Sequence, residues 1–178
     1  MEVTGEQLFR FLAKTHIFDG FTKEEVDAFL PSFKMMEVEA DHTIFEEGSI
    51  GDAWYVVLKG EVAVTKSMPQ GPPHVLAHME EGDCFGEMAL LDGAPRMASL
   101  YTVTDTVLAR LDREDFMQML REKSMPAIKL LWAMSSMLCV RQRDLTHVLA
   151  DLVEVPMHKA DPEYMVLNEL LRTHVTWN

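Results

Sequence analysis

The chain has 178 residues, enough for one compact domain with a sizeable core but too few for two full domains. Its formal net charge of −13 argues against nucleic acid and anionic membranes as partners. The chain has only two cysteines, so we expect no disulfide framework. We see no basic leader with an apolar stretch and no apolar run that spans a bilayer, so we expect a cytoplasmic protein.

Residues 5–33 carry helical signals. Apolar side chains recur at helical spacing between residues 8 and 13. Thr22, with Glu25 three positions later, forms a capping box that predicts the start of a second helix. Pro31 closes that helix or follows it. We therefore expect short helices ahead of the main body of the domain.

From residue 34 to residue 112 the apolar pattern changes to a period of two, interrupted by turn residues. Glycines punctuate this region where turns are expected, and strand-forming residues fill the segments between them. Short strands at this spacing predict a small antiparallel roll or barrel. The candidate strands are residues 35–39, 42–45, 54–59, 61–66, 74–79, 84–86, 98–104 and 106–111.

Residues 82–99 combine residue types that suit a phosphorylated sugar. Gly86 lets the backbone approach a ligand closely, and Glu87 offers a carboxylate that can accept from a sugar hydroxyl. Residues 88–91 are good helix formers and predict one short helical turn, whose N–H groups favour an anion. Arg96 is the cation of the segment, and its guanidinium can hold two phosphate oxygens at once.

Two helices are predicted after the strands. Asp112 is expected to cap a short helix over residues 113–121, and Pro126 suits the first turn of a long helix that ends near residue 152. Leucines in the long helix recur every seven residues, which favours pairing with a second helix. The alternative is that one helix packs on its own domain. The repeat comprises Leu131, Leu138, Leu145 and Leu152, with Met134, Val148 and Val155 at the complementary positions and Arg141 interrupting them.

The sequence divides into a domain at residues 1–152 and a short tail at residues 153–178. Asp161 and Pro162 predict the start of an amphipathic helix that runs to about Thr173. This helix docks on the long helix or binds a partner; the residues favour neither.

Residues 82–99, called the cassette below, resemble the phosphate-binding cassette of the cyclic-nucleotide-binding domain family. The matching runs are Phe85-Gly86-Glu87-Met88-Ala89-Leu90 and Pro95-Arg96-Met97-Ala98-Ser99. The resemblance covers roughly residues 18–150. It implies a mainly β fold with flanking helices: an eight-stranded antiparallel β-roll (a double-stranded β-helix) with N-terminal helices and a long C-terminal helix.

The same resemblance implies how a cyclic nucleotide is held. Arg96 is expected to neutralise the cyclic phosphate, backbone N–H groups near Ala89 and Met97 to donate to it, and Glu87 to accept from the ribose 2′-hydroxyl. The full set of expected ligand-binding residues is Phe85, Gly86, Glu87, Met88, Ala89, Arg96, Met97 and Ala98 in the cassette, Val62, Leu76 and Ala77 as an apolar wall beneath the base, and Arg143 and Asp144 on the long helix.

The base is harder to predict than the phosphate. Arg143 and Asp144 are either caps over the base or solvated helix charges. Family members that prefer cyclic GMP often carry Thr or Ser directly after the arginine, whereas this chain carries Met97, so cyclic AMP is expected. Cyclic GMP remains the alternative, because Asp144 can accept from a guanine edge.

These observations predict a sensor that is not an enzyme and holds no cofactor or metal. A metal-binding barrel using His42, His74 and His78 is the enzyme alternative, but no nearby carboxylate completes a ligand set. Only residues 156–178 follow the long helix, so we expect no DNA-binding domain. The expected protein is a stand-alone sensor or regulatory module that signals through its long helix, forms a homodimer through residues 128–152 and acts on an unidentified effector protein. The alternative is a protein-interaction module with a vestigial nucleotide pocket.

Overall fold

A computed structural model of the protein describes residues 5–154. The chain divides into two units, of which the first ends at Ser135 and the second begins at Ser136. The first unit opens with four short helical segments, as the sequence predicts. These are α1 (Gly5–Leu12), the 3₁₀ helix η1 (His16–Phe18), α2 (Lys23–Asp27) and the 3₁₀ helix η2 (Leu30–Ser32).

The predicted capping box at the start of α2 is confirmed. The hydroxyl of Thr22 accepts from the backbone N–H of Glu25 at 3.3 Å, and the Glu25 carboxylate accepts from the backbone N–H of Thr22 at 2.8 Å. Because two otherwise unpaired N–H groups are satisfied, α2 starts sharply at Lys23. The rings of Phe18 and Phe29 meet at 6.0 Å on either side of this helix and join the segments into one apolar cluster.

Within residues 5–154, eight strands form two four-stranded antiparallel sheets, which confirms the expected β-roll. The first sheet has the order β1-β8-β3-β6 and the second the order β2-β7-β4-β5. The strands are β1 (Phe33–Val38), β2 (Thr43–Phe45), β3 (Ala53–Lys59), β4 (Val62–Lys66), β5 (His74–Met79), β6 (Cys84–Phe85), β7 (Ser99–Thr102) and β8 (Thr106–Asp112).

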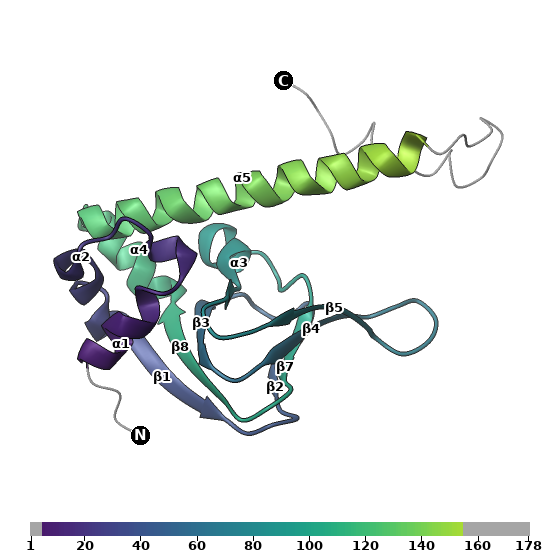
Figure 1. The fold of residues 1–178 in the computed structure, drawn as a ribbon, viewed down its shortest axis with the longest axis horizontal. Helices are drawn as coiled ribbons and strands as arrows, with labels where there is room; N and C mark the ends of the chain where they lie inside the picture. The colour runs from purple at the N-terminus through teal and green to yellow at the C-terminus, as the bar shows by residue number, and fades with distance from the viewer. Residues whose placement is uncertain (1–4, 155–178) are drawn as a thin grey trace. The chain divides into compact units, whose positions relative to one another are not determined.

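Strand β3 is buried on both of its faces. Tyr55 and Val57 point into the roll, where they pack with residues such as Leu100 of the second sheet. Trp54 points the other way, is fully buried, and lies 6.2 Å from the ring of Phe18 in the N-terminal helices. The helices α1, α2 and α4 lie together at one end of the roll, and the β4–β5 hairpin projects from the other (Figure 1).

Three further helices belong to the described chain. Helix α3 (Glu87–Asp92) lies between β6 and β7, whereas α4 (Arg113–Arg121) and α5 (Met125–Glu154) follow β8. The prediction that Asp112 caps α4 is right in position but wrong in mechanism. Asp112 occupies the N-cap position, yet its side chain makes no capping hydrogen bond. Its carboxylate is bound instead by Arg110 and Lys34, and these charge-assisted bonds replace the cap.

Helix α5 belongs to both units, and its two parts differ in burial. Ala127, Leu130 and Met134 are fully buried in the first unit, so Met134 of the predicted seven-residue repeat serves the domain's own core. In the second unit, Leu145 and Val148 are more than half exposed. Among the described residues, no helix is both long and apolar enough to cross a membrane. The predicted helix at residues 161–173 lies outside the described residues.

Candidate functional site

The cassette begins where β6 meets α3, at a glycine that the turn requires. Gly86 has a φ of +83°, in the left-handed region, and forms the N-cap of α3. Gly93 ends α3 with a φ of +72°. A helix at residues 87–92 therefore confirms the predicted short turn. It lies against β3, the buried central strand.

Arg96 follows α3 and turns its side chain inward. The side chain is only 3% exposed. Its Nη2 donates to the carbonyl oxygen of Ala53 at 2.8 Å, whereas Nε and Nη1 are buried without a hydrogen-bond partner. A Cβ at Gly86 would lie 2.6 Å from Nη1, so the glycine makes room for the guanidinium. The site thus holds a buried cation with unsatisfied donors.

The backbone on both sides of Arg96 is fixed by the segment after β2. The N–H of Arg96 donates to the Ser49 carbonyl at 2.9 Å, and the Arg96 carbonyl accepts from the N–H of Gly48 at 2.8 Å. Next along the chain, the Met97 carbonyl accepts from Nζ of Lys66 at 2.7 Å. Arg96 is therefore held by its main chain as well as by its side chain.

Aromatic rings form the floor beneath the guanidinium. The Cζ atom of Arg96 lies 4.1 Å from the ring centroid of Phe45 and 5.7 Å from that of Tyr55. Tyr55 is itself stacked on Phe85, with centroids 5.2 Å apart. Such an arrangement attracts a cation to the ring faces and excludes water from beneath it.

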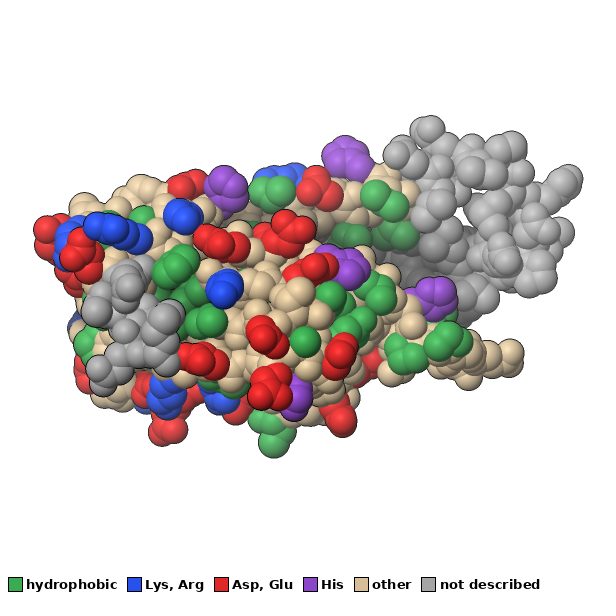
Figure 2. Space-filling model, turned by 60° about the horizontal axis from the view of Figure 1, so that its bottom comes forward, with side chains coloured by type: hydrophobic (Ala, Val, Ile, Leu, Met, Phe, Trp, Pro, Cys, Tyr) green, Lys and Arg blue, Asp and Glu red, His purple; other side chains and the backbone are tan. Residues whose placement is uncertain are grey.

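The charges around Arg96 are few and specific. Asp52 approaches Nη2 at 3.6 Å and is also bound by Arg110 at 2.9 Å, so its charge is shared between two arginines. Burial lowers the pKa of Arg96, while Tyr55, Asp52 and Glu87 oppose that shift. Acidic side chains are spread over the face shown in Figure 2, and Arg96 is set apart from that surface by its burial.

The structure brings together the core of the predicted cassette. Glu87 is 4% exposed in the first turn of α3, close enough to Arg96 to influence its charge. Ala89 is also buried. Met88 and Met97, in contrast, are 46% and 64% exposed, so their side chains face outward. Of the remaining cassette residues, Phe85 is buried in the core of the roll, and Gly86 and Ala98 are half-buried.

The predicted wall beneath the base is only partly assembled. Val62 is fully buried in the core and pairs with Met79, whereas Ala77 pairs with Val64. Leu76 is 61% exposed. The sequence interpretation missed the contact of Phe45 with Arg96, because no local pattern connects these two residues.

Arg143 and Asp144 are exposed residues of the second unit. Their place over the base stays a prediction.

The histidines of the enzyme alternative make local contacts. His78 Nδ1 lies 2.5 Å from a carboxylate oxygen of Glu61, and His42 Nδ1 lies 3.0 Å from the carbonyl of Ala40. Among the described residues, no group of three or more His, Cys, Asp or Glu side chains is placed to hold a metal ion.

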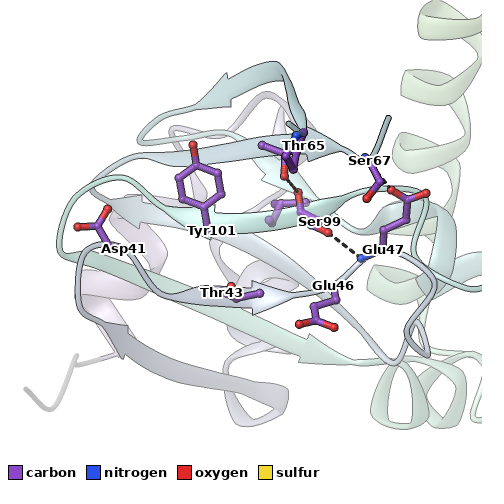
Figure 3. A pocket seen from close by; sticks show the side chains of 10 residues that line it. Asp41, Thr43, Glu46, Glu47, Thr65, Ser67, Ser99 and Tyr101 are labelled. Carbon is purple, nitrogen blue, oxygen red and sulfur yellow. Dashed lines mark hydrogen bonds between the residues drawn. The ribbon is translucent and has the colours of Figure 1, made fainter. Parts of the chain in front are cut away.

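A hollow of about 440 Å³ lies on the second sheet (Figure 3). Ser99 and Tyr101 line it and alternate along β7 with the core residue Leu100, so their side chains point away from the core. Thr43, Thr65 and the carboxylate of Glu46 complete much of its wall. Arg96 is not among the residues that line this hollow.

The fold and the cassette together define the class of protein: a β-roll domain in which the segment between β6 and β7 carries a short helix and one buried arginine. The family model described as the cyclic nucleotide-binding domain matches residues 35–123, and the chain belongs to this family.

Three relatives illustrate the family. The chain is 29% identical over 142 residues to a CRP-like cAMP-activated global transcriptional regulator of Mycobacterium tuberculosis, covering 80% of this chain and 62% of that protein. It is 36% identical over 110 residues to a cAMP-dependent protein kinase regulatory subunit of Aspergillus fumigatus, covering 62% of this chain and 26% of that protein. The solved cyclic nucleotide-binding domain from Methylobacillus flagellatus matches with a TM-score of 0.71 and 26% identity, covering 88% of this chain and 86% of that one.

The chain spans less than two thirds of the length of these two curated relatives. By name, these two relatives are a transcriptional regulator and a kinase regulatory subunit.

Proposed function

We propose that this protein binds a 3′,5′-cyclic nucleotide, cyclic AMP in particular, and acts as a stand-alone sensor or regulatory module that signals through α5. One observation carries the proposal: the Arg96 guanidinium is buried inside the cassette with Nε and Nη1 lacking partners. Buried polar groups are normally satisfied, and an unsatisfied buried donor is costly. An anionic ligand supplies the missing acceptors.

A cyclic phosphate suits this site in charge. It carries one negative charge, and the chain as a whole carries −13, so attraction must come from local cations. Arg96 provides a cation in a place that water does not reach, where a charge-assisted hydrogen bond is strong. Glu87, buried in the same cassette, is proposed to accept from the ribose 2′-hydroxyl.

Two considerations favour cyclic AMP over cyclic GMP. The two curated relatives described above are named for cAMP. In addition, Met97 stands next to Arg96 and has no hydroxyl to donate to a guanine. The proposed base contacts are Val62, Leu76 and Ala77, with either Arg143 or Asp144.

The output is proposed to pass through α5. Leu145 and Val148 expose apolar surface in the second unit, which favours a homodimer formed through residues 128–152. Residues 1–152 then form the sensing domain, and residues 153–178 a tail available to an effector protein. A ligand changes this assembly only by binding one of its states more tightly than the other. No reaction is proposed, since the relatives bear the names of regulators rather than enzymes.

Calorimetric titration with cyclic AMP and cyclic GMP tests the proposal. We expect saturable binding, tighter for cyclic AMP, and weaker binding of the 2′-deoxy analogue if Glu87 holds the ribose. Arg96→Ala is expected to weaken binding by about 30-fold to a few thousandfold, because removing one partner of a buried charge pair costs roughly 2–5 kcal/mol. Arg10→Ala, at an exposed arginine of α1, is the control and leaves the affinity unchanged.

The titration, together with thermal denaturation in the presence of each nucleotide, separates the two candidate functions. A ligand at a hundred times its Kd stabilises the folded protein by about 2.7 kcal/mol, so the melting temperature must rise with binding. No heat and no thermal shift with either nucleotide would reject the sensor and favour an interaction module with a vestigial pocket.

A further inference from the structure

The most unusual contact of the cassette joins residues far apart in the sequence. Phe45 ends β2, and its ring centroid lies 4.1 Å from Cζ of Arg96, closer than the 5.7 Å to Tyr55. A separation this short places the guanidinium directly on a ring. Phe45 itself is half-buried at the edge of the core cluster of the roll.

The main chain fixes this pair in register. Three residues after Phe45, the N–H of Gly48 donates to the Arg96 carbonyl at 2.8 Å, and the Ser49 carbonyl accepts from the Arg96 N–H at 2.9 Å. One residue before Gly48, the N–H of Glu47 donates to the hydroxyl of Ser99, three residues after Arg96, at 2.9 Å. The segment that carries the ring is therefore tied, bond by bond, to the segment that carries the guanidinium.

The Phe45 ring partly compensates the Arg96 guanidinium for the water that it loses on burial. Burial lowers the pKa of Arg96 because it removes water from the guanidinium, and two of its nitrogens find no hydrogen-bond partner. A flat aromatic face offers attraction without a hydrogen bond, and it restricts the many rotamers of a long side chain. An aliphatic side chain of similar size would fill the same space without that attraction.

We propose that Phe45 is a positioning residue for ligand binding: its ring holds the Arg96 guanidinium in place before the anion arrives. The proposal deepens the function proposed above and rests on it. Because the arginine is already oriented and dehydrated, the ligand gains the charge-assisted bonds without first ordering the side chain. Phe45 thereby sets the affinity for the phosphate, which all cyclic nucleotides share, rather than the choice of base.

Replacement of Phe45 tests the proposal through affinity. Phe45→Leu is expected to weaken cyclic AMP and cyclic GMP binding by the same factor, about 2- to 30-fold, the range of a cation–π contact. Phe45→Tyr keeps the ring and restores the affinity. Phe29→Leu is the matched control, since Phe29 is a fully buried phenylalanine of the helical cluster, outside the cassette. It lowers stability but leaves the affinity of the folded protein unchanged.

A spectroscopic measurement on the ligand-free protein gives an independent readout. The ring current of Phe45 should shift the Arg96 Nε–H proton resonance upfield of the other arginines. Most of the shift should be lost in Phe45→Leu, where only the more distant ring of Tyr55 remains, but it should persist in Phe45→Tyr. This readout requires no ligand, so it tests the stacking even if the wild type binds no cyclic nucleotide and the proposed function fails.

Two results would overturn the proposal. One is an Arg96 Nε–H resonance in the wild-type protein with no upfield shift, which needs no variant to fold. The other is a Phe45→Leu protein whose affinity equals that of the wild type, or falls no more than that of Phe29→Leu.

Discussion

Gly86 shows how a single residue sets the geometry of the cassette. Its φ of +83° lies in the region that residues with a Cβ avoid, and the space where a Cβ would project is taken by Nη1 of Arg96, 2.6 Å away, and by the Ala53 carbonyl, 3.0 Å away. Because glycine has no Cβ, Gly86 both allows the left-handed turn and leaves room for the Arg96 guanidinium.

Gly86→Ala is expected to damage the cassette in both respects. The strained backbone costs about 1–3 kcal/mol of unfolding free energy, and the arginine must move away from its ring. Urea denaturation measures the first effect and cyclic nucleotide titration the second. Gly71→Ala is the control, because Gly71 also has a positive φ, +94°, but nothing lies within 4 Å of its added Cβ. Equal affinity losses in the two variants would contradict the close-approach argument.

At the scale of secondary-structure elements, a polar joint connects α2 with α5 inside the first unit. Nζ of Lys129 donates to Glu25 at 2.6 Å and to the Gly20 carbonyl at 2.7 Å, and it lies 4.6 Å from the ring centroid of Phe21. Glu25 also completes the capping box. One carboxylate thus starts a helix and anchors another.

This joint predicts a pH dependence of stability. Lys129, together with the backbone N–H of Thr22, holds the pKa of Glu25 below its ordinary value of 4.5. Because the folded protein binds this proton less readily than the unfolded chain, the contribution is complete above pH 4.5 and is lost as the pH falls through the lower, folded-state pKa. Glu25→Gln should therefore be less stable than the wild type at pH 7.

Urea denaturation between pH 7 and pH 3 measures that difference. The gap in unfolding free energy between wild type and Glu25→Gln should narrow below pH 4.5. Glu80→Gln, at an exposed carboxylate, serves as the control and shows a small, constant gap. A constant gap for Glu25→Gln as well would refute the linkage.

Local patterns were sufficient to predict most elements of the first unit. The period of two and the glycine turns marked the strands, and the capping box placed the start of α2, although α2 ends at Asp27, before the end that Pro31 predicted. What failed depends on partners far away in the sequence. Asp112 has the chemistry of a cap, but its carboxylate is bound by the distant Lys34 of the neighbouring strand β1, and also by Arg110 two residues earlier on β8. Phe45 reads as an ordinary strand residue, because its role arises only when β2 is brought to the cassette.

At the scale of the whole molecule, the seven-residue repeat divides into a buried part and an exposed part. Met134 is fully buried in the first unit, whereas Leu145 is 58% exposed and Val148 55% exposed in the second. The sequence could not separate these parts, since a buried leucine in the domain core and one in a dimer seam look alike. The exposed part is the portion that a second copy would cover.

Leu145→Asp tests that assembly. If two copies pack through the exposed part of α5, the change buries an unpaired carboxylate and weakens the dimer by about tenfold or more. Light scattering coupled to gel filtration, over a dilution series, measures the dissociation. Thr146→Asp introduces the same charge one residue along, on a different face of the helix, and should have a smaller effect. A wild-type protein that is monomeric at every concentration would exclude a dimer formed through the exposed part of α5.

The burial of β3 on both faces has a consequence for how the first unit comes apart. Trp54 touches the ring of Phe18 in the helical cluster, while its neighbour Tyr55 is packed inside the roll. If either the helical cluster or the roll unfolds, one face of β3 is exposed to water, and the packing of the other part against β3 is weakened. Heating should therefore melt helices and roll in a single transition, with the indole fluorescence of Trp54 and the backbone circular dichroism changing at the same temperature.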